Sequence, residues 1–585
     1  MKVFGLVVLV FVAWNAGGCD GCGHESGEGP DAACVDEDGD GVTACAGDCD
    51  DADPFTFPGA PEVCGDAKDN TCGGQPDAGC GGIGTFVAGD PAKGSDTNPG
   101  TQASPVATIA KGMANAQMLA ASTGNAQSVF VAQGHYPEAI TLVEKISLRG
   151  GYDCTAATCT WSRNPIAFDT AILNQTYEGI VADTTITKAT VVDGFRIVGA
   201  SVGSTPVGAN GTNCMTLNSG SPKVTNNIFQ PAAISGQAQF QNRSIGIRIV
   251  SPTTDPTGAL IDANLFTGAM SQELSTGIVF TGPGQAGIAT NTNNVFNGGT
   301  AAQSRGISGF GSGPATLIAR NLMTCGTSTA GGDSWAIQLG TAATIDSNQI
   351  NIDQTAVGTC AGNNWCGGID AGGANVIITN NVVYGVKGPR STAVRLRDFE
   401  QALGTVVLNS NYLDGAGSGL STGSQSQSSA LVLGVFGGVN VFVGKVRNNI
   451  MMGGINNLRT GVFEDPNQTN AARTVHTEAF ENNDIFFLPA RASGDALYRA
   501  MSAGQPGTQT LYTTVATMEA GITIKNGGVA TGDLNADPMF DATFHIAATS
   551  PCANTGTATE APATDFENDA RPAGAATDIG NDETP

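Results

Sequence analysis

An acidic stretch near the start of the chain carries the residue types and the spacing of a metal site. Residues 36–51 read DEDGDGVTACAGDCDD and include no basic residue. Such a run of like charge repels itself and stays solvated unless a cation is bound. The carboxylates of Asp36, Asp38 and Asp40 alternate, and Gly41 precedes a residue whose backbone carbonyl can also serve as a ligand. This spacing suits a hard cation with about six to eight oxygen ligands.

The stretch is not a complete EF-hand, because the twelfth position of the loop is Gly47. Further oxygens must come from the acidic residues that follow. The predicted ligands are Asp36, Asp38, Asp40, Val42, Asp48, Asp50, Asp51 and Asp53. Calcium is the expected ion, since all these donors are oxygens; copper or zinc would favour histidine or thiolate, and only His24 lies nearby. The alternative is an acidic spacer that is held by disulfides and binds no metal.

Four short sequence blocks in the same region are similar to the motifs of a known protein module. They are DEDGDG (36–41), GDCDD (47–51), PGAPEVC (58–64) and DNTCGG (69–74). Together they resemble the bacterial metal-binding motif module that is found near the ends of secreted surface proteins. The resemblance implies a small metal-binding module over residues 34–80. So short a segment cannot bury a core, and Cys45, Cys49, Cys64 and Cys72 could tie its loops together.

The first nineteen residues predict export. One lysine is followed by an apolar run from Val3 to Ala13 and by small residues before Cys19, which is the pattern of a secretory signal. The ending AGGC is similar to a bacterial lipoprotein signal, which implies removal of residues 1–18, lipid on Cys19 and a linker over 19–33. We therefore expect a bacterial cell-envelope protein that is attached to the outer membrane through lipid and exposed at the surface. Ordinary secretion, with Cys19 in a disulfide, is the alternative.

The formal charge of −26 is concentrated at the two ends of the chain. Residues 20–80 hold sixteen acids and one base, residues 533–585 hold ten acids and one base, and residues 81–532 are almost neutral. This distribution excludes nucleic acid as a partner, because nucleic acid needs a basic footprint. Without Cys19, fourteen of the fifteen cysteines remain, an even number that is consistent with disulfides in an oxidising compartment.

The middle of the chain repeats with a period near thirty residues. A small residue followed by an apolar-x-apolar element recurs, with its first large apolar position at 247, 278, 307, 337, 369, 394 and 431. A segment with asparagine between apolar residues follows each time, such as ITNNVV (378–383). Fixed-period self-similarity indicates stacking. The pattern predicts an all-β fold, a right-handed parallel β-helix over residues 81–532; the rival β-propeller needs blades of ~40–50 residues.

The recurrent asparagine has a mechanical interpretation. Asparagine tolerates left-handed turn geometry, and inward-turned amides can hydrogen-bond from coil to coil as a ladder. We therefore expect a structural role for these asparagines and not a ligand site.

Both ends of the repeat region resemble known segments. Residues 90–152, which include VATIAKGMANA and SVFVAQGHYPEAITLVEKISLRGGYD, look like the opening segment of pectin-lyase-like β-helix surface proteins of bacteria. DFENDARPAGAATDIGNDE resembles their closing segment. The resemblance implies a short amphipathic helix over residues 105–121, and a closing coil with a C-terminal cap over residues 533–585. Such caps cover coil edges that would otherwise template aggregation.

Alignment of the repeats predicts one outward row of side chains on the β-helix flank. Asp370 and Arg395 become neighbours, with more charges just beyond them, and two tryptophans lie one coil apart near a predicted Cys360–Cys366 loop. Stacked aromatic rings beside hydrogen-bonding charges suit a sugar chain. The candidate carbohydrate contacts are Trp335, Trp365, Asp370, Arg395, Arg397 and Asp398. The alternative is an ordinary surface ion pair beside a solvated RLRDFE loop.

Catalytic signatures of pectate lyases and polygalacturonases are missing from the sequence, which has no GHG, no NTD with a following DD, and no RxPxxR. The four histidines lie far apart, and a packing role is expected for His135 and His545. We therefore expect a non-catalytic protein with a structural or adhesive role and polysaccharide or another surface component as its partner. The competing hypothesis is a polysaccharide lyase or glycoside hydrolase that acts along the flank.

Overall fold

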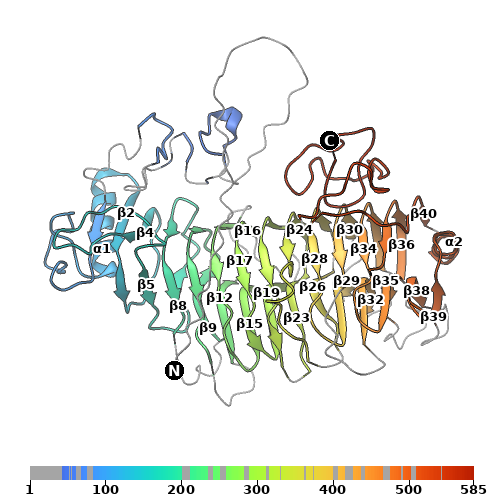
Figure 1. Cartoon of the computed structure of the whole chain (residues 1–585). Helices are drawn as coiled ribbons and strands as arrows, with labels where there is room; N and C mark the ends of the chain where they lie inside the picture. Colours follow the sequence, from blue (N-terminus) through green and yellow to red (C-terminus); the bar gives the residue numbers. More distant parts are fainter. Residues whose placement is uncertain are drawn as a thin grey trace, which may run out of the picture.

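Three long sheets wind around one continuous apolar interior (Figure 1). Successive coils of the computed structural model stack along a single axis, so the main body is a parallel β-helix. The structure describes residues 42–51, 53, 56–58, 60, 68–75, 84–200, 211–234, 242–250, 258–281, 289–310, 315–329, 331–361, 364–372, 375–399, 406–415, 426–436, 442–465, 475–488, 490, 492–501, 509–526, 528–541 and 543–584.

Each sheet collects the equivalent strands of successive coils. Sheet 1 contains β1 (Thr85–Val87), β2 (Gln127–Ala132), β4 (Ile146–Tyr152), β7 (Val191–Asp193), β10 (Lys223–Thr225), β13 (Ala259–Asp262), β16 (Ala289–Thr292), β20 (Thr316–Ala319), β24 (Ala343–Asp346), β27 (Val376–Thr379), β30 (Val406–Asn409), β33 (Phe442–Arg447), β36 (Val475–Glu481) and β40 (Val529–Thr531). Sheet 2 contains β3 (Gly134–Tyr136), β5 (Thr170–Leu173), β8 (Arg196–Val198), β11 (Ile228–Gln230), β14 (Leu265–Phe266), β17 (Val295–Asn297), β21 (Leu322–Thr324), β25 (Gln349–Ile350), β28 (Val382–Tyr384), β31 (Tyr412–Asp414), β34 (Ile450–Met452) and β37 (Asp484–Phe486).

Sheet 3 contains β6 (Ile180–Ala182), β9 (Thr212–Asn218), β12 (Arg243–Val250), β15 (Leu274–Thr281), β19 (Gln303–Phe310), β23 (Ser334–Gly340), β26 (Cys366–Ala371), β29 (Arg390–Phe399), β32 (Gln427–Phe436), β35 (Leu458–Glu464), β38 (Ala496–Met501) and β39 (Gln509–Tyr512). The short strands β18 (Thr300–Ala301) and β22 (Thr327–Ser328) pair with each other. Neighbouring coils pair in parallel, and the terminal β38–β39 pair is antiparallel.

The register of sheet 3 confirms the predicted repeat. Ile247 pairs with Ile278, and the row continues through Ile307, Ile337, Ile369, Val394 and Leu431. All of these side chains are buried in one apolar cluster that runs along the molecule. Equivalent aromatic rings also align: Phe266 stacks between Phe229 and Phe296, with ring centroids 4.8 and 4.6 Å apart. The apolar faces of successive coils therefore form a single continuous core.

The small residue of each repeat faces that interior. A Cβ atom on Gly246 would lie 2.8 Å from a ring carbon of Phe266, and one on Gly277 would lie 2.6 Å from a ring carbon of Phe296. Protein interiors are close-packed and leave no room for such an atom. The aromatic stack on sheet 2 therefore requires glycine at the facing position of sheet 3.

We expect Gly277→Ala to lower the free energy of unfolding by about 1–3 kcal/mol, because the added methyl overpacks the core against Phe296. Chemical denaturation followed by circular dichroism measures this loss. Gly434→Ala is the matched control, since its Cβ atom would meet nothing closer than 3.9 Å. Adding Phe296→Leu to Gly277→Ala should recover part of the loss, and equal stability of the two glycine variants would contradict the explanation.

The predicted asparagine ladder is present and fully buried. Oδ1 of Asn381 accepts hydrogen bonds from the backbone N–H and the side-chain Nδ2 of Asn348, both at 2.9 Å. Nδ2 of Asn381 donates to the carbonyl of Ile345 and to Oδ1 of Asn411, again at 2.9 Å. The same links join Asn227, Asn264, Asn294, Asn321, Asn348, Asn381, Asn411, Asn449 and Asn483.

The left-handed turn belongs to a different residue from the ladder amide. Positive φ angles occur at the residue just before each ladder asparagine, for example 52° at Asn226, 55° at Arg320 and 56° at Asn380. The sequence interpretation gave both roles to one asparagine. The structure corrects this, because the left-handed residue forms the bend from sheet 1 to sheet 2 and the asparagine after it makes the ladder.

Asp533 ends the ladder at the C-terminal coil. Its Oδ1 accepts from the backbone N–H (2.8 Å) and Nδ2 (3.1 Å) of Asn483. Burial raises the pKa of Asp533 well above its usual value; the hydrogen bonds from Asn483 oppose this shift, and Glu519 and Glu481 add to it. The ionised carboxylate therefore opposes folding.

We expect Asp533→Asn to stabilise the C-terminal coils at pH 7 and to change little at about pH 3. The folded-state pKa lies above the unfolded value of ~3.9, so the penalty is absent below that value and grows as the pH rises toward the folded pKa. Thermal unfolding of both proteins at the two pH values measures the difference. An equal shift at pH 3 and pH 7 would contradict the role of the charge.

Helices close both ends of the β-helix (Figure 1). α1 (Ile109–Thr123) begins and ends slightly later than the predicted helix over 105–121, and its Ile109, Met113 and Ala116 pack on the first coil. α2 (Val515–Asn526) inserts Met518 and Ile522 at the opposite end. Among the described residues, no helix has the length and apolar character needed to cross a membrane.

Residues 543–584, here called the C-terminal segment, lie along the flank instead of across the end. Nδ2 atoms of ladder-flanking asparagines donate to its backbone carbonyls, from Asn409 to Glu560 (2.7 Å) and from Asn448 to Thr557 (2.8 Å). Its apolar residues Ile546, Cys552 and Ile579 pack against Val382, Tyr412 and Ile450 on the outer face of sheet 2. The predicted C-terminal cap is therefore corrected: α2 already covers the last coil, and the segment covers an apolar strip on the side.

Candidate functional site

The acidic module is described only from residue 42, with gaps. The predicted ligands Asp36, Asp38 and Asp40 and the predicted lipidation site Cys19 lie outside the described residues. The other predicted ligands, Val42, Asp48, Asp50, Asp51 and Asp53, surround η1 (Ala44–Ala46) and the turn that follows it. Asp48 is buried, and its Oδ1 accepts a hydrogen bond from the backbone N–H of Asp50 at 2.9 Å.

Lys68 provides a cation for two of the predicted ligands. Its Nζ lies 3.1 Å from Oδ2 of Asp50 and 2.6 Å from Oδ2 of Asp53. Burial lowers the pKa of Lys68, but the hydrogen bonds and charges of these two aspartates outweigh burial and raise it. The sequence interpretation missed this contact because no spacing rule connects Lys68 to the loop. A metal ion that uses Asp50 and Asp53 must displace the ammonium group.

The donors of the described part of the module are oxygens. Cys49 and Cys72 form a disulfide, and Cys45 is also disulfide-bonded. These sulfur atoms are therefore not thiolates and are unavailable to zinc or copper. Carboxylates together with a backbone carbonyl at Val42 fit a hard cation such as calcium.

The second candidate region is the flank of sheet 3, where the predicted outward row is confirmed in register. Asp370 pairs with Gln338 on one side and Arg395 on the other, and the row includes Arg248, Val279, Ser308, Gln338, Asp370, Arg395 and Val432. Asp370 is completely buried. It accepts hydrogen bonds from Nε and Nη2 of Arg395 (2.8 and 2.8 Å), from Nε and Nη2 of Arg397 (2.9 and 2.5 Å), and from Nε2 of Gln338 (2.9 Å).

This geometry corrects two sequence interpretations. The alternative of an ordinary surface ion pair does not hold, because both Asp370 and Arg395 are buried. The RLRDFE stretch is not a solvated loop either, since its residues up to Phe399 belong to strand β29. Asp398 pairs with Val435 through the backbone, and its side chain lies outside the described part.

Asp370 is held in its ionised form. Burial alone would raise the pKa of this carboxyl, but the charges and hydrogen bonds of Arg395 and Arg397 outweigh burial and hold the pKa well below its usual range. Such a carboxylate carries no proton to donate at neutral pH, and its oxygens are already engaged by five N–H groups. Neither general acid nor general base chemistry follows from this arrangement.

Both candidate tryptophans are buried, with 0% exposure for Trp335 and 3% for Trp365. They form a cluster with Val432 and Phe463 on the outside of sheet 3. The guanidinium of Arg395 lies over the Trp335 ring, 4.5 Å from its centroid, and Nε1 of Trp365 donates to Oδ2 of Asp465 at 3.1 Å. These rings pack on the protein's own side chains, so they present no open face to a sugar ring.

The cysteines behave in two ways. The predicted Cys360–Cys366 disulfide is present, as is a Cys154–Cys159 disulfide. Cys214, Cys325 and Cys552 are buried free thiols. An even cysteine count therefore does not mean that every cysteine is paired, because buried free cysteine also serves as a small apolar residue.

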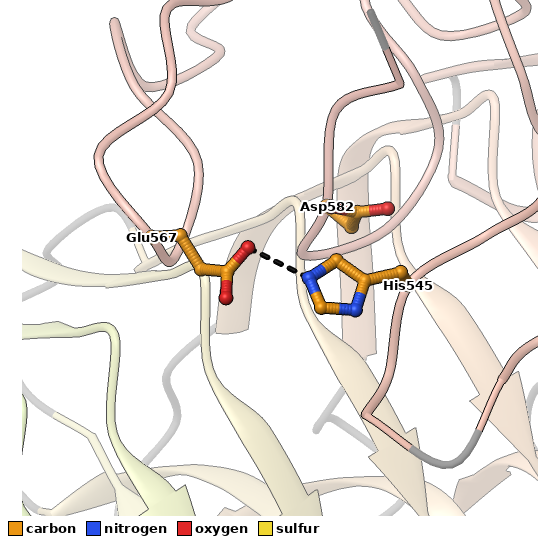
Figure 2. Close-up of side chains that lie close together, drawn as sticks. All are labelled: His545, Glu567 and Asp582. Carbon is orange, nitrogen blue, oxygen red and sulfur yellow. Dashed lines mark hydrogen bonds and ion pairs between the residues drawn. The ribbon is translucent and has the colours of Figure 1, made fainter. Parts of the chain in front are cut away.

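A third cluster, of side chains that could bind a metal ion, was not predicted from the sequence. His545, Glu567 and Asp582 converge in the C-terminal segment (Figure 2), although His545 had been expected only to pack. The three residues come from separate turns and follow no periodic pattern. A histidine and two acids within one closing segment were the available signal.

Comparison with known proteins gives two matches. The family model Cu-binding MopE, described as "Putative metal-binding motif", matches residues 48–78. No curated protein matches the chain. Among solved structures, the chain is similar to "Crystal structure of pectate lyase Pel9A", with 15% identity, 86% of this chain and 98% of that chain covered, and a TM-score of 0.31. A likeness of this size carries no argument about activity. The metal-binding motif predicted in the acidic module is confirmed, and the parallel β-helix follows from the strand pairing itself.

Proposed function

We propose that the protein is a cell-envelope lipoprotein with a non-catalytic β-helix that acts as a structural or adhesive scaffold. The observation that carries this proposal is the environment of Asp370. Asp370 and Arg395 are buried, and Asp370 is paired and hydrogen-bonded with Arg395 and Arg397, so these three charges support the flank instead of facing a substrate. Lipid on Cys19 attaches the scaffold to the outer membrane, and its exposed flanks contact polysaccharide or another surface component.

Incubation of the purified protein with a panel of acidic and neutral polysaccharides, with and without calcium, tests this function. Retention without cleavage is the expected result. New reducing ends or unsaturated uronates would overturn it and favour a lyase or hydrolase. For the anchor, Cys19→Ala should move the protein from the membrane fraction to the soluble fraction, and unchanged membrane association would count against lipid at this position.

The acidic module adds a calcium site to the proposal. Its support is the oxygen donor set around Asp48 and the disulfide state of Cys45, Cys49 and Cys72. Extracellular calcium modules bind with Kd on the order of 10⁻⁴–10⁻³ M. Chelation should therefore speed proteolysis within residues 36–72 while the β-helix stays folded. Proteolysis of that segment at the same rate with and without calcium would contradict a calcium site.

A further inference from the structure

The C-terminal segment brings three metal-binding side chains to one point (Figure 2). One ligand atom each from His545, Glu567 and Asp582 lies within 4.8 Å of the other two. Nε2 of His545 is 2.7 Å from Oε2 of Glu567. Asp582 is only 4% exposed, and its Oδ2 accepts a hydrogen bond from the backbone N–H of Ile546 at 2.9 Å. The third ligand is thus fixed to the backbone next to the histidine.

A hydrogen-bond relay orients the imidazole. Oγ1 of Thr543 donates to Oδ1 of Asp541 at 2.8 Å and lies 2.8 Å from Nδ1 of His545. Because the hydroxyl hydrogen is directed at Asp541, Oγ1 accepts from Nδ1–H. On the other side of the ring, Nε2 lies 2.7 Å from Oε2 of Glu567, where the carboxylate accepts its hydrogen, so a metal ion bound at Nε2 would take the place of this proton. A hydrogen bond to the nitrogen that does not bind the metal holds the ring of a metal-binding histidine in its orientation.

The charge of the segment also favours a cation. Residues 543–584 contain seven acids, one arginine and one histidine. Glu560 pairs with Lys445 and Arg447 of the β-helix, and Glu583 pairs with Arg571 at 2.8 Å. Glu567 and Asp582 meet at His545 instead. Because burial of a carboxylate costs free energy unless a positive charge compensates it, a divalent ion between these groups would stabilise the segment.

A metal ion at this point would stabilise the fold of the C-terminal segment. Its described residues 543–584 contain no helix or strand of their own, and they lie over the outer face of sheet 2. A metal ion that joins turns at residues 545, 567 and 582 would cross-link a segment without a backbone ladder. Metal binding contributes directly to the folding of small irregular units of this kind.

We propose that His545 Nε2, Glu567 and Asp582 bind a divalent transition-metal ion of the zinc type that holds the C-terminal segment in place. An imidazole nitrogen with two carboxylates suits zinc better than calcium, and three protein ligands leave a fourth position for water. Tetrahedral bonds of about 2.0–2.2 Å place ligand atoms roughly 3.3–3.6 Å apart, so the contact of 2.7 Å between Nε2 of His545 and Oε2 of Glu567 would lengthen when the ion binds. This site is distinct from the oxygen-lined acidic module.

Equilibrium dialysis of the chelator-treated full chain against Zn²⁺ tests the proposal. The wild type should bind one zinc ion more than His545→Ala or Glu567→Gln, and millimolar Ca²⁺ should not displace that ion. His135→Ala is the matched control, because His135 is exposed on β3 and far from the cluster. Thr543→Val should weaken zinc binding by about 10–100-fold through loss of the relay.

A local readout keeps the test independent of other metal sites. Zn²⁺ should slow proteolysis within residues 543–584 of the wild type and of His135→Ala, and should leave Glu567→Gln unprotected. Glu567 is partly exposed, so its amide variant keeps the fold even where His545→Ala disturbs packing. Equal zinc stoichiometry and affinity in wild type and Glu567→Gln, or protection by Ca²⁺ equal to that by Zn²⁺, would overturn the proposal.

Discussion

Asp370→Ala is expected to lower the free energy of unfolding by about 3–5 kcal/mol, because it removes the buried anion that pairs with the buried Arg395 and the partly buried Arg397. In the wild type both guanidinium groups bind the same carboxylate through paired hydrogen bonds. Removal of that carboxylate keeps the desolvation of the two cations and leaves their mutual repulsion uncompensated. Urea denaturation followed by circular dichroism measures the loss.

A matched control separates burial from charge pairing in general. Asp169 pairs with Arg196 at 2.5 Å, but its side chain is 52% exposed. Asp169→Ala should therefore cost no more than about 1 kcal/mol. The triple variant Asp370→Leu, Arg395→Met, Arg397→Met should recover most of the loss of Asp370→Ala, since an apolar cluster of similar volume replaces the buried charges. Equal destabilisation by Asp169→Ala and Asp370→Ala would contradict this account.

The ion pairs of Asp370 with Arg395 and Arg397, here called the Asp370 clamp, stabilise the protein to a degree that depends on pH. The folded-state pKa of Asp370 lies below its unfolded value of ~3.9, so the stabilisation is fully present above about pH 4 and is lost as the pH falls toward the folded pKa. The stability difference between wild type and Asp370→Ala should therefore be constant from pH 5 to pH 8 and shrink below pH 4.

Asn381→Ala is the second substitution with a large expected effect. It removes the acceptor of the Asn348 N–H and the donor to the carbonyls of Ile345 and Thr379, all of which are buried. The carbonyl of Thr379 keeps the hydrogen bond from the backbone N–H of Ser347. Each buried polar group that loses its partner costs about 1–3 kcal/mol, so the other two give a loss of about 2–6 kcal/mol. Denaturant unfolding measures the total, and hydrogen exchange of the amide of Asn348 reports the local opening.

Asn297→Ala is the control for the ladder, because Asn297 is an exposed asparagine at the outer end of β17. It should change stability by less than about 0.5 kcal/mol, as surface substitutions usually do. If Asn381→Ala were as mild as Asn297→Ala, the ladder amides would not be needed to satisfy the buried backbone.

The ladder and the clamp act on different parts of the scaffold. The ladder satisfies polar groups at each turn between sheets 1 and 2, whereas the Asp370 clamp and the tryptophan cluster with Val432 and Phe463 cover the outside of sheet 3. In the acidic module, Lys68 likewise forms ion pairs with Asp50 and Asp53. In the middle region, the charges of Asp370, Arg395 and Arg397 thus stabilise the outer face of sheet 3.

The sequence by itself determined the coil, its register and its ladder. A period near thirty placed Ile247 beside Ile278 and Asp370 beside Arg395, and both pairs are present. Periodicity succeeds here because each coil pairs only with its neighbours, so spacing along the chain translates directly into stacking. The sequence also located the metal-binding motif, because the residues of the motif lie close together along the chain.

Only the tertiary structure decided what covers each row of side chains. An outward position in a coil can face water or another part of the protein, and no repeat distinguishes the two. Trp335 and Asp370 are buried on the flank, the C-terminal segment lies over sheet 2, and His545 meets Glu567 and Asp582. These contacts join residues whose separation in sequence follows no period, and their stability depends on packing between segments that local patterns do not encode.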